Sequence, residues 1–270
     1  MIDVLVSLGV MSLLVAIMVP ALGSVRAAAQ RVVCGSNLRQ IGIGVVIYAD
    51  ANRDQLPPSV MAGSLELEDI VPPTSTVSIN TNMGNSIALR FDIGSGPNST
   101  HWDSLGVLHE SGILETPELF YCPSHHGPHT YEANLDEWHT GRGLLVGNYQ
   151  YRGASLDGVT KFSLVQPSRT ALVSDSFRSA RELNHQDGFY MLRADLSVTW
   201  LTDSGNVLLG AVPQDIDTLS QSSMTDITSA SEMDELFYND YWQTLQTWDD
   251  SGRFNKPNGA GDHGGASSKP

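Results

Sequence analysis

The stretch VLVSLGVMSLLVAIMVPALGSV, residues 4–25, runs for 22 positions without a Lys, Arg, Asp, Glu or His. As an α-helix it would be about 33 Å long, close to the thickness of one membrane hydrocarbon core. Asp3 precedes this stretch, and Arg26, Arg31 and Arg39 follow it. The sequence therefore predicts an apolar helix that either crosses a membrane or packs against other apolar surfaces.

The helical pattern continues beyond Arg26. Residues 27–30 are strong helix formers, and apolar residues then recur at close to the helical period up to Ala49-Asp50, where we expect the helix to end. The apolar positions are Val33, Leu38, Ile41, Val45 and Tyr48. Gly35, Gly42 and Gly44 weaken the helix, and they are either small residues that let it approach a sheet closely or glycines that the helix merely tolerates. The whole helix would be about 75 Å long.

Three interpretations of residues 4–25 compete. A secretory signal peptide needs basic residues before a shorter apolar run and a small-residue cleavage site. Small residues occur at Ala27, Ala28 and Ala29, but the residue before the run is Asp3. A membrane anchor fits the length, although a carboxylate at its end does nothing for orientation. The third interpretation is a helix that is surrounded by copies of itself.

The segment Met1-Ile2-Asp3 through Val19-Pro20-Ala21-Leu22 resembles the mature amino terminus of type IV pilins and type II secretion pseudopilins. In that family an acidic residue lies just inside an apolar helix, with a proline about 17 residues further on, as Asp3 and Pro20 are here. The family's mature chain starts with an N-methylated Phe or Met two residues upstream of Met1, after a cleaved Gly, and the sequence departs from this pattern. The resemblance implies that Asp3 and Pro20 serve assembly.

For these two residues we expect specific roles. Asp3 would neutralise the positive amino terminus of a neighbouring subunit and set the axial register, because an unpaired carboxylate among apolar helices is costly. Pro20 would break or stretch the helix between about Ser12 and Gly23 in the assembled filament. The alternative is a mild kink with all other helical bonds kept.

Further motifs are similar to a large planctomycete-type family of pseudopilin-like proteins. They are CGSNLRQIG at 34–42, YAD at 48–50, LP at 56–57, WDSLGVL at 102–108, FYCPS at 120–124 and YQYRG at 149–153. That family ends its head with a His, nine residues and Asp-Gly; here His185 and Asp195 are ten positions apart, and Leu196 replaces the Gly. The resemblance covers about residues 1–201. It implies an α+β fold in which the long helix packs on a mostly antiparallel β-sheet head.

The sequence pattern of the head agrees with this expectation. Strand-like runs lie at Thr170–Ser174, Gly188–Leu192 and Ser197–Thr202, and the last two read as an antiparallel hairpin. Residues 56–100 are rich in turn formers and are predicted to form long surface loops. We divide the chain into an apolar helix (1–25), its amphipathic continuation (26–50), a β-rich head (51–204) and a carboxy-terminal extension (205–270). The end of that extension, from Gly259, is expected to be flexible.

The composition limits the function. The 270 residues include 15 basic and 30 acidic ones, a formal net charge of −15, which argues against nucleic-acid binding by a basic face. A hydrolytic triad built on His185 and Asp187 would need a serine, but the sequence has no Gly-x-Ser-x-Gly elbow, phosphate loop or dinucleotide fingerprint. We therefore expect no enzyme active site and no cofactor.

Four other features are candidate sites. Cys34 and Cys122 are the only cysteines, and we expect a disulfide rather than two buried thiols because the chain is expected to be exported. His125, His126 and His129 either form a hydrogen-bonded loop or contribute to a zinc site, although no second ligand pair accompanies them. Asp50, Asn52 and Asp54 form either a helix-ending turn or a calcium site, without the Gly and Glu of an EF-hand. Asn98-Ser99-Thr100 is a glycosylation sequon.

Two functions follow from these observations. The first is a structural subunit of a type IV pilus-like or pseudopilus filament, held in the inner membrane before assembly and at the cell surface afterwards. Its partners would be other copies of the chain and the inner-membrane assembly machinery. The second is a membrane-anchored periplasmic or surface binding protein that does not polymerise.

Overall fold

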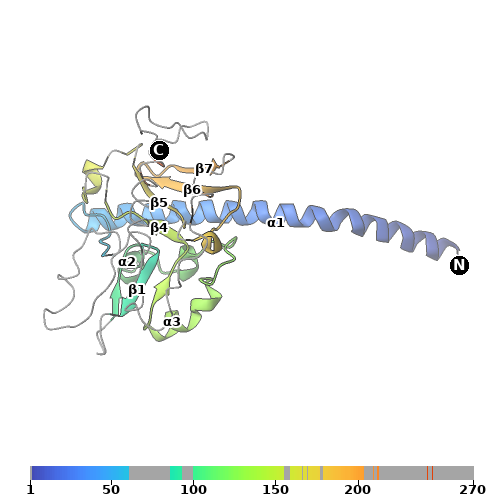
Figure 1. Ribbon diagram of the computed structural model, residues 1–270, viewed down its shortest axis with the longest axis horizontal. Coiled ribbons are helices and arrows are strands. Elements are labelled where there is room, and N and C mark those ends of the chain that lie inside the picture. Colours follow the sequence, from blue (N-terminus) through green and yellow to red (C-terminus); the bar gives the residue numbers. More distant parts are fainter. Residues whose placement is uncertain are drawn as a thin grey trace, which may run out of the picture.

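The computed structural model of the protein describes residues 2–60, 86–92, 100–154, 159–165, 167–168, 170–176 and 179–203, with Leu209, Val212, Trp242 and Leu245. These residues form one long helix and a head of antiparallel sheets that packs against the carboxy-terminal half of that helix (Figure 1). The expected α+β architecture, a long amino-terminal helix on a mostly antiparallel head, is confirmed.

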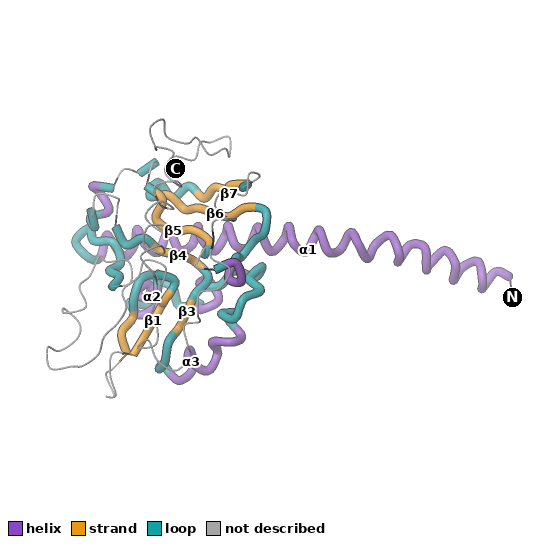
Figure 2. Tube along the Cα trace, viewed as in Figure 1, coloured by secondary structure: helices purple, strands orange, loops and turns teal. Residues whose placement is uncertain are grey.

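Helix α1 spans Ile2–Ala51 and ends within two residues of its predicted end. Its amino-terminal half projects from the head as a bare rod, and its second half lies against the sheets (Figure 2). The backbone is helical through Pro20 in this single chain. The expected unwinding concerned the assembled filament, so it stays a prediction.

The head contains two antiparallel sheets. The first has the strand order β2 (Thr100–Trp102), β1 (Ala88–Asp92), β3 (Leu145–Val146), and the second has the order β4 (Tyr149–Tyr151), β5 (Ala171–Asp175), β6 (Gly188–Arg193), β7 (Val198–Thr202). Short helices α2 (Gly106–Glu110) and α3 (Leu135–Thr140) flank the first sheet. Strands β5, β6 and β7 match the three predicted runs, and β6 pairs with β7 as the predicted hairpin.

Strand β1 corrects the prediction of surface loops for residues 56–100. Four of its five residues are buried, including Arg90, which is 1% exposed. The guanidinium of Arg90 donates to the backbone carbonyls of Glu137, Arg142 and Gly143 and lies 4.9 Å from the ring centroid of Trp102. A charged residue in the middle of a strand reads as an exposed position in a hydropathy pattern, and here its charge is buried because backbone carbonyls bind it. The pattern therefore did not predict this strand. Residues 61–85 and 93–99, including Asn98 of the sequon, lie outside the described residues.

The inner face of α1 packs across β6, β7 and the short 3₁₀ helix η3 (Pro117–Phe120). A Cβ atom at Gly35 would lie 3.1 Å from the Tyr190 ring, and one at Gly42 would lie 2.9 Å from Leu192. Both neighbours belong to β6, so close approach to a sheet is confirmed for Gly35 and Gly42. Gly44 is crowded instead by Leu108 of α2 and by Leu114 of the loop that follows it. The buried residues of this face are Cys34, Asn37, Leu38, Ile41, Val45 and Ala49.

One predicted member of that face is wrong. Val33 is 47% exposed, and its neighbour Cys34 is fully buried. Leu38, Ile41 and Val45 are buried as predicted, and Tyr48 is partly buried against the core, so the predicted phase of the helix is right. Cys34, rather than Val33, occupies the first position of the buried face, from which it reaches Cys122.

The β6–β7 turn forms although Leu196 occupies the position where the resemblance expected Gly. Leu196 has a φ of +66°, in the left-handed region that costs a non-glycine residue about 1–2 kcal/mol. The carboxylate of Asp195 accepts hydrogen bonds from the backbone and hydroxyl of Ser197, at 2.9 and 2.5 Å. The Leu196 side chain lies beside Gly42 of α1, so the turn also contacts the helix.

Part of the carboxy-terminal extension packs on the head. Successive side chains of β6 point to opposite faces of the sheet and therefore belong to two different cores. Tyr190 and Leu192 face α1, whereas Phe189 and Met191 face away from it. The second core also contains Leu209, Val212, Trp242 and Leu245. The predicted flexible tail from Gly259 lies outside the described residues.

Candidate functional site: the exposed half of the helix and its junction with the head

The amino-terminal half of α1 exposes apolar side chains in every direction. Thirteen large apolar residues between Val4 and Val25 are each at least 52% exposed in the single chain. Leaving this many apolar side chains in water costs on the order of 20 kcal/mol relative to burying them. By length and composition the helix is able to cross a membrane. We therefore expect the apolar side chains of this half to be buried elsewhere, in a membrane, among other helices, or first in one and then in the other.

A second exposed apolar feature lies beside the head. Val32, Val33, Ile43 and Ile47 are 69%, 47%, 47% and 50% exposed. At 100° per residue, these four side chains fall within an arc of about 100°, which the polar residues Ser36 and Gln40 share. Val32, Ile43 and Ile47 face away from the head, and Val33, at one edge of the arc, also borders a groove between α1 and the Glu118–Glu132 segment. We call the four apolar side chains the outward stripe. It continues the apolar surface of residues 4–25 along the part of the helix that carries the head.

Asp3 lies in the first turn of α1 and is exposed. The free backbone amides of a helix start carry a partial positive charge, so a carboxylate there is favourable by about 0.3–1 kcal/mol even in a single chain. The expected pairing with a neighbouring amino terminus involves a second chain and stays a prediction.

The head first contacts the helix at Gln30 and Arg31. The Gln30 side chain donates to the carbonyl of Pro123 at 2.8 Å. Arg31 forms an ion pair with Asp187 at 2.8 Å, and its guanidinium lies 4.0 Å from the ring centroid of Trp200 in β7. Both carboxylate oxygens of Asp187 accept hydrogen bonds from the Arg31 guanidinium. This contact marks the boundary between the bare rod and the head.

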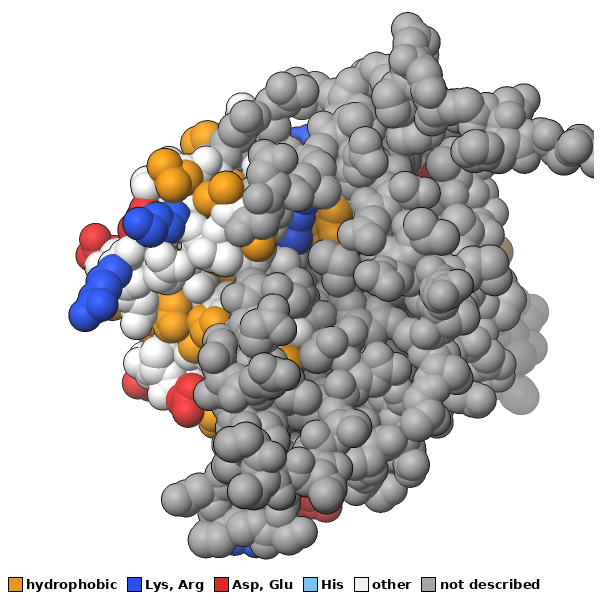
Figure 3. All heavy atoms as spheres, turned by 60° about the vertical axis from the view of Figure 1, so that its left-hand side comes forward, with side chains coloured by type: hydrophobic (Ala, Val, Ile, Leu, Met, Phe, Trp, Pro, Cys, Tyr) orange, Lys and Arg blue, Asp and Glu red, His pale blue; other side chains and the backbone are white. Residues whose placement is uncertain are grey.

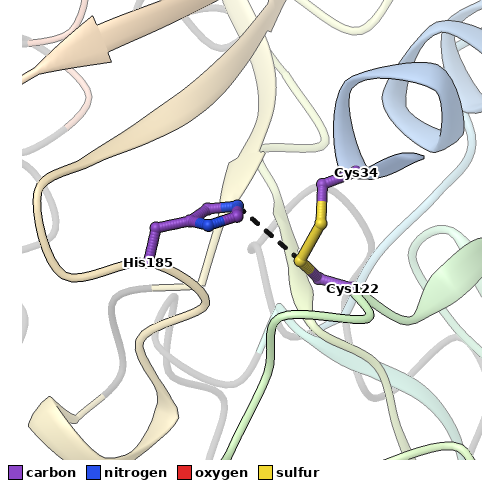
Figure 4. Close-up of side chains that lie close together, drawn as sticks. All are labelled: Cys34, Cys122 and His185. Atoms are coloured by element: carbon purple, nitrogen blue, oxygen red, sulfur yellow. Dashed lines mark hydrogen bonds between the residues drawn. A yellow bond between two sulfur atoms is a disulfide. The ribbon is translucent and has the colours of Figure 1, made fainter. Parts of the chain in front are cut away.

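Just beyond this boundary, Cys34 of α1 is joined to Cys122 by a disulfide, which confirms the predicted bridge (Figure 4). Cys122 is also held by its backbone N–H, which donates to the side-chain oxygen of Asn148 at 3.1 Å. Asn37, one turn after Cys34, donates to the carbonyl of Tyr121 at 3.0 Å. The disulfide and the buried Asn37 amide contact therefore fix the helix to the Phe120–Ser124 segment, and Asn148 holds that segment from the side of the sheets.

His185 closes this junction from the side of the second sheet. Its Nε2 atom lies 3.7 Å from the Sγ of Cys122 and 3.7 Å from the nearer carboxylate oxygen of Asp175 (Figure 4). Burial, together with the nearby Arg31 charge, lowers the pKa of His185 to about 4. The family-motif histidine therefore lies at the disulfide. The motif's Asp195 lies instead in the β6–β7 turn.

Asp175 is the most deeply buried acid of this junction, at 1% exposure. Its carboxylate accepts hydrogen bonds from the side-chain amide of Asn184 at 2.9 Å and the backbone N–H of Tyr190 at 2.7 Å. Burial nevertheless raises the pKa of Asp175 to about 7. Asn184 also donates to the carbonyl of Asn148, so the two asparagines connect Asp175 to Cys122.

Two of the three clustered histidines belong to the same polar network. His125 is hydrogen-bonded through Nδ1 to Asn184 at 2.9 Å, and His129 lies 3.3 Å from a carboxylate oxygen of Glu182. His126 is exposed. The structure therefore supports a hydrogen-bonded histidine loop for this segment. Among the described residues, these three histidines do not form a group able to share one metal ion.

Asp54 and Asn52 form contacts within the turn that ends α1. Asn52 donates to the carbonyl of Tyr48, and Asp54 accepts hydrogen bonds from the backbone and hydroxyl of Ser163. Asp50 is exposed. These contacts support the interpretation of the segment as a helix-ending turn, with Asp54 linking it to residues 161–163.

A groove lies next to the disulfide, between α1 and the Glu118–Glu132 segment. Its volume is about 420 Å³, and its lining includes Arg26, Gln30, Asn37, Tyr131 and His125. At the end of the head opposite the amino terminus, the described part of the surface carries acidic, basic and apolar side chains side by side (Figure 3).

Comparisons of this chain with protein-family models, with curated proteins and with solved structures found no match. The junction residues that the sequence did not single out are Asn37, Asn148, Asp175 and Asn184. They come from distant segments and share no spacing. Two features of the sequence lie close to them and could have indicated the junction. One is the YQYRG motif, which directly follows Asn148, and the other is the spacing of His185 from Asp195.

Proposed function

We propose that the chain is a structural subunit of an extracellular filament of the type IV pilus or pseudopilus class, which polymerises through α1. Before assembly, residues 4–25 would hold it in the inner membrane, where the assembly machinery would collect it. In the filament the apolar helices would lie at the centre and the heads outside. No step of this proposal needs an enzyme site or a cofactor.

The outward stripe is the observation that carries this proposal. If residues 4–25 fill the hydrocarbon core, Ile47 lies roughly 33 Å beyond Val25 along the helix axis. A membrane therefore covers the rod but leaves Val32, Val33, Ile43 and Ile47 in water. Exposed apolar side chains that recur along one side of a helix in this way favour a protein interface. Another copy of α1 offers a matching apolar surface of the same length.

The proposal is tested on material sheared from the cell surface. We expect negative-stain images to show regular thin filaments that contain this chain, and Ile43→Lys to abolish them because a charge then enters the helix bundle. Leu164→Lys is the matched control, because Leu164 is 66% exposed on the head. If the wild-type chain stays in the membrane fraction and no filament contains it, the proposal is wrong.

The second candidate is a membrane-anchored binding protein, and the groove beside α1 is the observation that favours it. A volume of about 420 Å³ is in the range of small-ligand pockets. This function predicts a chain that remains monomeric when extracted into detergent. In the shearing experiment, a binding protein of this kind would stay in the membrane fraction, whereas a filament subunit would be found in the sheared filaments.

A further inference from the structure

The junction between the helix and the head brings together a set of metal-binding side chains. The Sγ atoms of Cys34 and Cys122 and a ring nitrogen of His185 all lie within 4.8 Å of one another, and all three residues are buried. Among the described residues, this is the one group of three His, Cys, Asp or Glu side chains that meets in this way. Figure 4 shows the imidazole of His185 pointing at the sulfur of Cys122.

A fourth donor, Asp175, lies beside His185, although it is outside the set of three whose ligand atoms all lie within 4.8 Å of one another. The Nε2 atom of His185 is 3.7 Å from Asp175, whose carboxylate is held by two neutral donors, the Asn184 amide and the Tyr190 backbone N–H. A buried carboxylate is costly unless a cation or a full set of hydrogen bonds compensates it. Two cysteines, one histidine and one carboxylate are a donor set typical of a closed tetrahedral zinc site.

We propose that the reduced form of this junction is a zinc site, with Cys34, Cys122 and His185 as ligands and Asp175 as the fourth. In the disulfide form the two sulfurs are bonded to each other and are poor ligands. Metal binding and the disulfide are therefore alternative states of the same residues. In each state the junction ties α1 to the Phe120–Ser124 segment and, through His185, to the second sheet.

The chemistry of the exchange balances. A dithiol reduces the bridge: the S–S bond breaks, each sulfur gains a proton and an electron, and the dithiol becomes a disulfide. Zn²⁺ then replaces the two thiol protons, which leave to solvent, and forms two Zn–S bonds. Two thiolates on one zinc are about 3.8 Å apart. The Cα atoms of Cys34 and Cys122 are 5.2 Å apart, so side-chain rotation is sufficient for this separation.

The surroundings suit a structural rather than a catalytic metal. The two cysteines are 0% and 4% exposed, His185 is 8% exposed and Asp175 is 1% exposed. Four protein ligands leave no open position for water or substrate. The Asn148 side chain, which accepts from the Cys122 backbone N–H, would hold that ligand from outside the metal shell.

Cobalt(II) titration of the full chain in detergent micelles tests the site. The chain is reduced anaerobically with a dithiol, desalted, and titrated while the visible spectrum is recorded. We expect one cobalt per chain, with the strong d–d bands of tetrahedral cobalt, a thiolate-to-cobalt charge-transfer band, and displacement by one equivalent of Zn²⁺. The oxidised chain should show none of these bands.

Variants identify the ligands. His185→Ala and Asp175→Asn should each weaken cobalt binding at least tenfold, and Cys34→Ser should remove most of the charge-transfer intensity. His139→Ala, an exposed histidine, is the matched control and should bind as the wild type does. Folding of the reduced chain is followed by circular dichroism, and recovery of native ellipticity on adding cobalt also supports the site.

Three results would overturn the proposal. One is a reduced wild-type chain that takes up no stoichiometric cobalt, whether it stays folded or not. Another is a cobalt spectrum that is unchanged in His185→Ala. The third is equal cobalt binding by the oxidised chain, because the sulfurs would then not be ligands.

Discussion

Residues 4–25 and residues 30–51 belong to the same helix but differ in what surrounds them. The first part projects from the head, and its described large apolar side chains are exposed on every side. The second part buries one face against the head and is held there by a disulfide, an ion pair and amide hydrogen bonds. The comparison indicates that one part gains its stability from the chain's own fold and the other from surroundings that the single chain does not supply.

This difference predicts opposite consequences for substitutions. Changes in the exposed half should alter assembly and leave the head folded. Changes in the packed half should alter the stability of the head. The outward stripe is the exception, because it lies on the packed half but points away from the head.

Asp3→Ala should have the largest effect on the exposed half. Loss of its charge removes the proposed partner of a neighbouring amino terminus, an interaction of several kcal/mol in an apolar bundle, so filament yield should fall at least tenfold. Asp3→Glu keeps the charge and should retain most of the polymer. Yield is measured in the sheared fraction, and head folding by thermal melting. Wild-type polymer in Asp3→Ala would refute the assigned role.

Cys34→Ser should have the largest effect on the packed half. The bridge closes a loop across a sequence separation of 88 residues, so its loss should destabilise the head by about 4 kcal/mol on the loop-entropy model. Urea unfolding of the full chain in detergent measures this change. Intact mass after alkylation of the unreduced, denatured wild type is the companion test. Alkylation of both cysteines would show that the bridge is absent.

The polar network of the packed half predicts a pH dependence. Burial lowers the pKa of His125 to about 4, so the unfolded state binds more protons between pH 4 and 6.5, and stability should rise with pH across that window. His185 acts in the same direction, whereas the raised pKa of Asp175 acts in the opposite one. Since two histidines act against one acid, we expect the net change to be a rise.

His125→Asn tests this prediction because the amide can still donate to Asn184 without titrating. The rise in unfolding free energy from pH 4.5 to 6.5 should become clearly smaller in the variant than in the wild type. His126→Asn, at an exposed neighbour, should leave the rise unchanged. An identical pH profile in His125→Asn and the wild type would contradict the buried position of this histidine.

The smallest expected effect is at Leu196, where the β6–β7 turn meets the helix. Leu196→Ala and Leu196→Gly both remove the side chain that lies beside Gly42, but only the glycine relieves the positive φ. Leu196→Gly should therefore be more stable than Leu196→Ala by about 1 kcal/mol. The two melting curves decide this, and equal or reversed stabilities would mean that the turn is not left-handed at this position.

The same comparison shows what could be predicted from the sequence. The long helix, its end, the β6–β7 hairpin and the Cys34–Cys122 bridge follow from local periodicity and from a single pair of cysteines. Strand β1 could not be predicted, because the buried charge of Arg90 is neutralised by carbonyls that only the fold brings near. On α1 the predicted positions Leu38, Ile41 and Val45 are buried, but Val33 was assigned to the buried face in place of Cys34, because apolar periodicity does not tell these two neighbours apart.

The polar junction was also beyond prediction. Asp175 and Asn184 lie in segments where nothing in the local pattern requires a buried polar residue. Their role depends on the tertiary contact of β5 with the segment that precedes β6. His185 was singled out by its spacing from Asp195, yet in the structure its nearest polar neighbours are Cys122 and Asp175.

The central claim is that the outward stripe contacts another copy of α1, and photo-crosslinking tests it most directly. A benzophenone amino acid is placed at Ile43, with a second chain carrying it at Leu164 as the control, and surface material is irradiated and analysed by mass. With the crosslinker at Ile43, we expect dimers and higher multiples of the chain, and we expect the crosslink to map to α1 of the second copy. With the crosslinker at Leu164, the yield of crosslinked chains should be much lower. Monomers alone, or adducts only to lipid, from Ile43 in the surface fraction would contradict the claim.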